Sequence, residues 1–103
     1  MEKFTVEVDK DLEDIVPNFM NNRNKDIVEL RALLADKDYS SIEKIAHKVA
    51  GSSGGYGFTE LGKIAKDIEL KVMAGETDPI GSLLDSFQDY IDNVEIEFVE
   101  MDD

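Results

Sequence analysis

The chain has 103 residues, of which 42% are hydrophobic and 34% charged, a composition typical of one globular domain with a single core. Its 24 acidic residues outnumber the 11 basic ones, and the net charge of −13 argues against binding to nucleic acid or to an anionic membrane surface. The chain has no cysteine, no apolar run near the roughly 18 residues of a membrane span and no secretory signal, so we expect a monomeric cytoplasmic protein without disulfides.

The first ten residues are expected to form an N-terminal extension. Within it, apolar and polar residues alternate in the segment Phe4-Thr5-Val6-Glu7-Val8. A helix is predicted over residues 11–35, where apolar residues recur three and four positions apart. Pro17 lies inside this pattern, so the helix either kinks there or restarts with Pro17 in its first turn.

The second predicted helix begins near Ser40. Ser40 and Glu43 have the spacing of a capping box, in which a side chain at each position bonds a free backbone group at the other. The apolar stripe of this helix comprises Ile42, Ile45, Ala46, Val49 and Ser53. The glycines between Gly51 and Gly57 weaken the helix and end it beyond Ser53.

Two further helices follow. The third is predicted from Thr59, a capping residue, to Gly75, a typical C-terminal stop. The fourth starts at Asp78-Pro79, a capping carboxylate followed by proline at the first helical position. Its apolar face comprises Ile80, Leu83, Leu84, Phe87, Ile91, Val94 and Phe98. An acidic tail, residues 100–103, is expected to follow this helix.

Four amphipathic helices with short connections predict an all-α fold. Each apolar stripe must be buried against another, which favours an antiparallel, up-down four-helix bundle over residues 11–99. The bundle is expected to have an additional short or kinked helical segment at its N-terminal end. We interpret residues 1–103 as a single domain.

His47 is the only histidine, and it does not lie on the apolar face of its helix. At about 100° per residue, it falls about 140° from Ile42, whereas the apolar stripe stays within roughly 60° of that direction. The residues one turn further on are Ala50 and Gly51, followed by Gly54. Such residues would leave one side of the imidazole uncovered, which favours an accessible nucleophile and proton carrier.

Other chemistries have less support in the sequence. A single histidine without a fixed acidic cluster does not predict a metal site. Ser52 or Ser53 would have to serve as the nucleophile of a hydrolase, but Ser53 projects toward the core and nothing marks an oxyanion hole. The glycine-rich segment 51–57 lacks the lysine and the preceding strand of a phosphate-binding loop, and no residue pattern predicts an ATP site.

The segment around His47 resembles the signature of the histidine-containing phosphotransfer domains (HPt domains) of two-component phosphorelays. The matching residues are His47-Lys48-Val49-Ala50-Gly51-Ser52-Ser53, Gly57-Phe58, Leu61, Ala65 and Ile68-Glu69. The family pattern places glycines four and ten positions after the phosphorylated histidine and a leucine fourteen positions after it, where this chain has Gly51, Gly57 and Leu61. The resemblance covers residues 38–69, and the flanking helices agree with the four-helix bundle of the family.

This resemblance implies a phosphorelay intermediate. His47 would accept a phosphoryl group from the aspartyl phosphate of a receiver domain and pass it to another receiver, with a hybrid histidine kinase as a further partner. The chain would need no cofactor of its own, because Mg²⁺ and the acidic pocket would belong to the receiver. It would carry phosphohistidine rather than act as a stand-alone enzyme.

One position departs from the family pattern. Members commonly carry a lysine three residues after the histidine, and this chain has Ala50 there. The residues that we expect near the phosphoryl group or the receiver are Lys44, Lys48, Ala50, Gly51, Gly54 and Lys66, with Lys63 as a further lysine within reach. Which lysine, if any, stabilises phosphohistidine stays open at this stage.

Two alternative functions also stay open. The chain could be an adaptor that docks on a receiver or kinase without being phosphorylated, which the loss of the lysine at Ala50 favours. It could also be the phosphoacceptor domain of a larger histidine kinase of the chemotaxis type, whose acceptor domains also have the pair seen here as Gly57-Phe58.

Overall fold

A computed structural model describes residues 4–100, which form four α-helices and a pair of strands. In chain order the elements are β1 (Phe4–Asp9), α1 (Val16–Ala35), α2 (Tyr39–Ser53), α3 (Thr59–Met73), α4 (Ile80–Asn93) and β2 (Val94–Val99). Short 3₁₀ turns at Lys10–Leu12 and Gly54–Tyr56 precede α1 and α3. The prediction of a mainly helical domain is confirmed.

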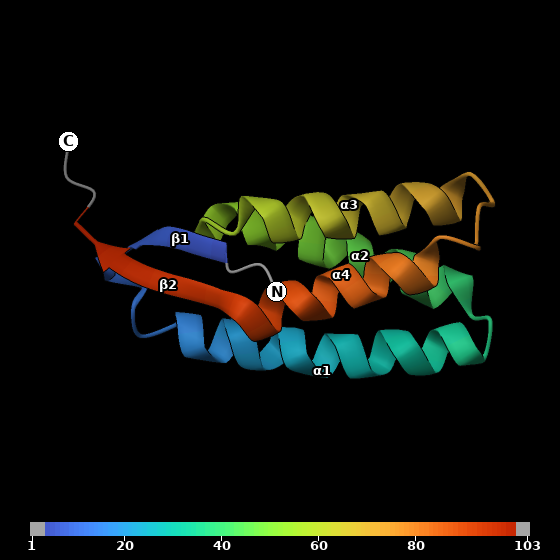
Figure 1. Ribbon diagram of the computed structural model, residues 1–103, viewed down its shortest axis with the longest axis horizontal. Coiled ribbons are helices and arrows are strands. Elements are labelled where there is room, and N and C mark those ends of the chain that lie inside the picture. The colour runs from blue at the N-terminus through green and yellow to red at the C-terminus, as the bar shows by residue number, and fades with distance from the viewer. Residues whose placement is uncertain (1–3, 101–103) are drawn as a thin grey trace.

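The helices lie side by side along the long axis of a molecule measuring 44 × 27 × 19 Å (Figure 1). The colour gradient shows α1 and α3 running in one direction and α2 and α4 returning in the other. Each helix contacts two neighbours, in the cyclic order α1, α2, α3, α4, and the most extensive of these contacts joins α2 to α3. The site helices therefore belong to the most closely packed pair.

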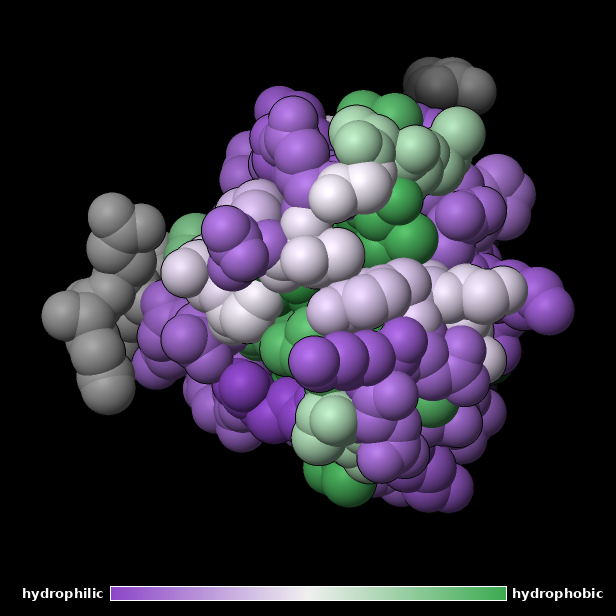
Figure 2. Space-filling model, turned by 90° about the vertical axis from the view of Figure 1, so that its right-hand side faces the viewer, coloured by the Kyte–Doolittle hydropathy of each residue, from purple (hydrophilic) through white to green (hydrophobic). Residues whose placement is uncertain are grey.

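The core is apolar and draws on all four helices and on β1. Its largest fully buried side chains are Val8, Val16, Leu30, Ile42, Val49, Phe58, Leu61, Ile68, Ile80, Leu84, Phe87 and Tyr90. The end of the molecule that carries the connections 36–38 and 74–79 is mostly hydrophilic, with a few hydrophobic residues visible between polar ones (Figure 2). Each helix buries one apolar face against the others, and this burial holds the four helices together.

The strand pair is absent from the sequence prediction. Residues 94–99 were expected to continue the fourth helix, but they form β2, which pairs in parallel with β1 from Phe4↔Val94 to Asp9↔Val99. Val94 fits the helical spacing of α4, yet Val94-Glu95-Ile96-Glu97-Phe98-Val99 also alternates as a strand does. Residues 94–99 form a strand because β1, in the predicted N-terminal extension, provides the backbone groups with which they pair. Parallel strands need a long crossover connection, and here the whole helical bundle provides it.

The residues at which the helices begin differ in part from those expected from the sequence. Helix α1 starts at Val16 with Pro17 in its first turn, so the restart rather than the kink is observed. Helix α2 is capped by Asp38, whose Oδ1 accepts a hydrogen bond from the Ser41 N–H at 3.2 Å, and not by Ser40. Helix α3 begins at Thr59 itself.

The ends of α3 and α4 give one agreement and one correction. Gly75 follows α3 with φ +74 and ends it, as predicted, because this backbone conformation favours glycine. Asp78 was expected to cap α4, but the cap position is Pro79, and among the described residues no side chain hydrogen-bonds this cap. Most of the predicted acidic tail, residues 101–103, lies outside the described residues.

Gly57 joins the strand pair to the helices. It has φ +91, and a Cβ atom there would lie 3.1 Å from the backbone oxygen of Glu7 and 3.7 Å from the Val8 side chain. Only glycine allows this backbone conformation and this approach without strain. The turn between α2 and α3 therefore packs directly on β1.

We predict that Gly57→Ala lowers the free energy of unfolding by about 1–2 kcal/mol, the cost of a left-handed conformation in a residue with a Cβ. Gly55→Ala is the matched control, because a Cβ at Gly55 would meet no described atom within 4 Å. Urea unfolding followed by circular dichroism measures both changes. Equal stability of the two variants would contradict the close packing of the turn on β1.

Candidate functional site

The site is built where α2 meets α3. Small residues lie in this contact: a Cβ added to Gly62 on α3 would lie 3.6 Å from both the Ala50 backbone oxygen and the Ser53 Cβ on α2. Ala46 on α2 and Ala65 on α3 are also small and are buried in the core. Small side chains let two helix backbones approach closely. This closeness brings side chains on the flank of α2 within hydrogen-bonding reach of α3.

His47 lies on that flank, off the core, as its helical position predicts. Its side chain is 73% exposed, yet its Nδ1 lies 2.6 Å from Oε2 of Glu69 on α3. The Glu69 side chain is only 8% exposed. One nitrogen of an otherwise open imidazole is thus held by a buried carboxylate.

Lys66 completes the group. Its Nζ lies 3.2 Å from Oε1 of Glu69, the carboxylate oxygen that His47 leaves free. Burial raises the pKa of the Glu69 carboxyl, but the hydrogen bonds from Lys66 and His47, together with their charges, outweigh burial and lower it. Glu69 is therefore ionised at neutral pH, and an ionised carboxylate only accepts hydrogen bonds. The proton between Glu69 and His47 belongs to Nδ1, so in the neutral imidazole Nε2 keeps its lone pair.

Three of the lysines that we expected near His47 lie on the side of the molecule formed by α2 and α3. Lys44 lines an open hollow of about 310 Å³ together with Glu43, His47 and Glu69. Lys66 reaches His47 through Glu69. Lys63 pairs with Glu60 at 3.6 Å. The structure therefore brings two of the expected lysines, Lys44 and Lys66, into the surroundings of the imidazole.

Lys48 belongs to a different groove, between α1 and α2, of about 430 Å³. There the buried Arg23 lies over the Phe19 ring, places Nε 2.8 Å from Oδ2 of Asp26, and donates from Nη1 to the Ser52 hydroxyl at 3.3 Å. Burial raises the pKa of Asp26, against the opposing charges of Arg23 and Lys48. Lys48 thus faces the α1 side of α2, away from the hollow that contains His47.

The remaining expected residues are small and follow His47 in the chain: Ala50 and Gly51 lie in α2, and Gly54 begins the 3₁₀ turn after it. Ala50 is half-buried, and Gly51 and Gly54 are exposed. A Cβ on either glycine would meet no described atom within 4 Å. Packing within the described chain does not require glycine at these two positions.

Glu69 is the residue that reasoning from the sequence missed as a member of the site. It appeared there only as part of the family signature. The available signal was a carboxylate directly after Ile68 and four positions after Ala65, on the inward side of an amphipathic helix. A charged residue in such a position is buried only with a partner, but the sequence does not show that the partner is His47.

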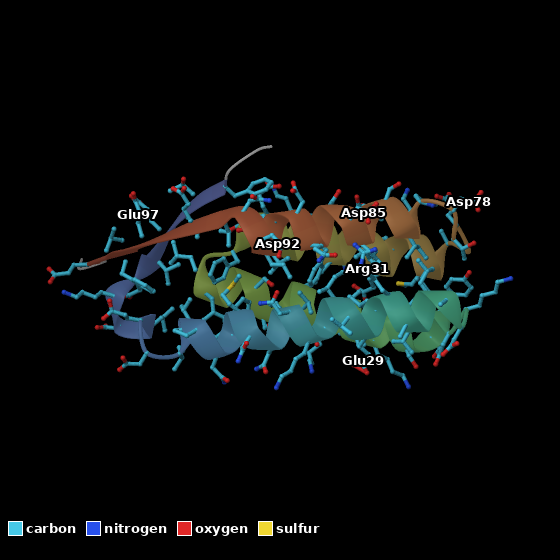
Figure 3. The ribbon with its side chains drawn as sticks, turned by 60° about the horizontal axis from the view of Figure 1, so that its bottom comes forward. Glu29, Arg31, Asp78, Asp85, Asp92 and Glu97 are labelled. Atoms are coloured by element: carbon cyan, nitrogen blue, oxygen red, sulfur yellow. The ribbon has the colours of Figure 1, made fainter. Side chains whose placement is uncertain are left out.

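Charge is unevenly distributed around the site. Residues 39–73, which contain α2 and α3, hold five lysines and four carboxylates, so the acid excess lies in the rest of the chain. Asp85 and Asp92 on α4, Glu97 on β2 and Asp78 in the connection before α4 lie on the outer surface (Figure 3). Arg31 reaches from α1 toward α4 and pairs with Asp85 at 3.0 Å (Figure 3). The His47 surface is the less acidic one.

Two further findings bear on the kind of site. Within residues 4–100, no group of three or more histidine, aspartate or glutamate side chains is placed to hold a metal ion. None of the helices in this part of the chain is long and apolar enough to cross a membrane.

Residues 1–97 match the family model of the Hpt domain, and the chain belongs to this family. Hpt domains are the histidine-containing phosphotransfer modules of two-component signalling and interact with receiver domains. No curated protein and no solved structure matches the chain significantly.

We predict that the unphosphorylated wild-type protein carries the imidazole proton on Nδ1 of His47, because the ionised Glu69 can only accept. Long-range ¹H–¹⁵N NMR spectra of the imidazole distinguish the two tautomers. In Glu69→Ala the proton is expected to redistribute to Nε2, whereas Asp67→Ala, on the exposed side of α3, should leave the tautomer unchanged. A wild-type imidazole protonated mainly on Nε2 at neutral pH would contradict this arrangement.

Proposed function

We propose that the protein is a phosphorelay intermediate that accepts a phosphoryl group on Nε2 of His47 from the aspartyl phosphate of a receiver domain and passes it to another receiver. The observation that carries this proposal is the exposed imidazole whose Nδ1 is held by a buried carboxylate. Family membership supports the class of reaction. The assignment to His47 rests on its being the only histidine of the chain.

The reaction needs little from this chain beyond a positioned nucleophile. The Nε2 lone pair attacks phosphorus, the bond between phosphorus and the aspartyl oxygen breaks, and the receiver carboxylate leaves as an anion. The proton on Nδ1 stays in the hydrogen bond to Glu69, which stabilises the positive charge that develops on the ring. Return transfer to a second receiver reverses these steps. Mg²⁺ bound by the receiver would neutralise phosphoryl charge, so the chain needs no cofactor of its own.

The surroundings of His47 suit an approaching receiver. Because Gly51 and Gly54 leave open surface beside the histidine, a partner can close over the ring. The near-neutral charge of α2 and α3 removes the repulsion that the rest of this acidic chain would exert on an acidic active site. Lys44 and Lys66 remain the candidates for contact with the phosphoryl group, while Lys48 is placed to contact a receiver from the α1 side.

We predict that the wild-type protein, mixed with a phosphorylated receiver and Mg²⁺, acquires phosphate that is labile to acid and stable to base, as phosphohistidine is. His47→Gln should acquire none, because the amide is not a nucleophile. Transfer of radioactive phosphate from receivers of the source organism, followed by gel electrophoresis, measures this. Label retained in His47→Gln, or absent from wild type with every receiver, would refute the proposal.

Ala50 favours a second candidate, an adaptor that docks on a receiver or kinase without being phosphorylated. It lies three residues after His47, on the same helical face, where the family commonly has a lysine. The adaptor would form a complex whose affinity survives His47→Ala, with no label transferred. An acceptor domain of a chemotaxis-type kinase would instead take label from a separate catalytic domain and ATP.

We predict that Ala50→Lys lengthens the lifetime of the phosphorylated protein several-fold, because an ammonium group would then lie near the phosphoryl oxygens. A gain worth about 1 kcal/mol, typical of an exposed ion pair, corresponds to about fivefold. The decay of isolated phosphoprotein measures the effect, with Ala50→Gln as a control for side-chain size. Equal lifetimes in all three proteins would show that the missing lysine is irrelevant to phosphohistidine stability.

A further inference from the structure

Strand β2 has one edge without a neighbouring strand. The sheet consists of β1 and β2, so within residues 4–100 no further strand lies beside the second edge of β2. The strand pair projects past the helices at one end of the molecule (Figure 1). The backbone N–H and C=O groups along such an edge can pair with another strand. Two strands alone are only marginally stable, and a third strand would stabilise them.

The apolar side chains of β2 are incompletely buried. Val94, Ile96 and Phe98 pack against the core but are only half-buried. On β1, Val8 lies opposite Phe98 in the register and is 1% exposed, at the place where β1 packs on the turn at Gly57. A strand beside β2 would therefore have apolar side chains to pack against, whereas the same end of β1 is already covered.

The outer side of the strand pair is acidic. Glu7 and Glu97 lie opposite each other in the register, and both are exposed. No lysine or arginine in the described part of the chain forms an ion pair with either of these carboxylates. Like charges in directly opposite positions destabilise a strand pair. A cation held beside Glu97, which lies on the outer surface (Figure 3), would offset this repulsion.

We propose that the free edge of β2 binds an extended basic segment of a partner protein, in which apolar residues alternate with lysine or arginine. The segment would form a third strand, with its backbone paired to residues 94–99. Its apolar side chains would cover Ile96 and Phe98, and its cations would lie beside Glu97.

Charge argues against a second copy of this chain as the occupant. Two β2 strands paired with each other would place their acidic sides next to one another, in two molecules that each have a net charge of −13. A basic segment has the opposite charge. The hollow around His47 is lined by Glu43, Lys44, His47 and Glu69, none of which belongs to the strand pair. The bound segment therefore occupies a surface separate from the imidazole.

The first test titrates the ¹⁵N-labelled full chain with a synthetic peptide of alternating valine and lysine and follows binding by NMR. The backbone amides of residues 94–99 should show the main shift changes and should exchange their hydrogens more slowly. One control peptide has the same composition with valines and lysines in separate blocks, and a second is N-methylated along its backbone. Both controls should bind about tenfold more weakly, the effect of losing one or two backbone hydrogen bonds.

Two outcomes of this titration would overturn the inference. Equal binding of the N-methylated or the block peptide would mean that charge attraction alone holds the peptide. Shift changes centred outside β2, or no binding of the alternating peptide, would mean that the edge is not a docking surface.

The second test compares Glu97→Gln with Asp92→Asn, a matched removal of one exposed carboxylate from α4. Glu97→Gln should bind the alternating peptide about fivefold more weakly, the size of an exposed ion pair, and Asp92→Asn should bind as wild type. Urea unfolding establishes that both variants keep the wild-type fold. Equal loss in both variants would assign the binding to net charge and would overturn the inference.

Sedimentation equilibrium of the wild-type protein without peptide decides the choice of occupant. A monomer is expected, because the acidic strand pairs of two copies repel each other. A dimer whose β2 amides are protected from exchange would show that a second copy covers the edge and would overturn the proposal of a basic partner. All of these measurements use unphosphorylated protein, so their outcome is independent of whether His47 accepts phosphate.

Discussion

The hydrogen bond between His47 and the buried Glu69 is the interaction on which the site depends. It joins an exposed imidazole on α2 to a carboxylate that is almost closed to solvent on α3. Burying an unpaired carboxylate destabilises the folded state. The pairing of Glu69 with His47 and Lys66 therefore offsets the cost of its burial. The close packing of α2 on α3, where Gly62 approaches Ala50 and Ser53, sets the distance at which this bond can form. Core packing and site chemistry are therefore coupled.

The glycines that follow His47 are explained in two different ways. Gly57 is required by the fold, because it has a positive φ and approaches the backbone of Glu7. Gly51 and Gly54 have open space around them. The packing of the described chain explains the first of these glycines, and an external partner that must reach the imidazole offers a reason for the other two.

The arrangement suits a protein that supplies a nucleophile and leaves the rest of the chemistry to its partner. Phosphoryl transfer depends mainly on positioning and on neutralisation of charge. This chain provides the positioned nitrogen on a surface that is less acidic than that of α4 and β2, which carry exposed carboxylates. The strand pair joins the first described residues to the last ones. Its strand β1 also packs on the turn that follows α2.

The sequence alone determined the presence of four helices and the position of His47 off the apolar face of its helix. These follow from apolar spacing, which is local and is repeated over many turns. Tertiary structure decided what local pattern leaves ambiguous: residues 94–99 fit both a helix and a strand, and only pairing with β1 selects the strand. It also decided that Glu69 meets His47 and Lys66, because a contact between two helices depends on how closely their backbones pack. No spacing within one helix contains that information.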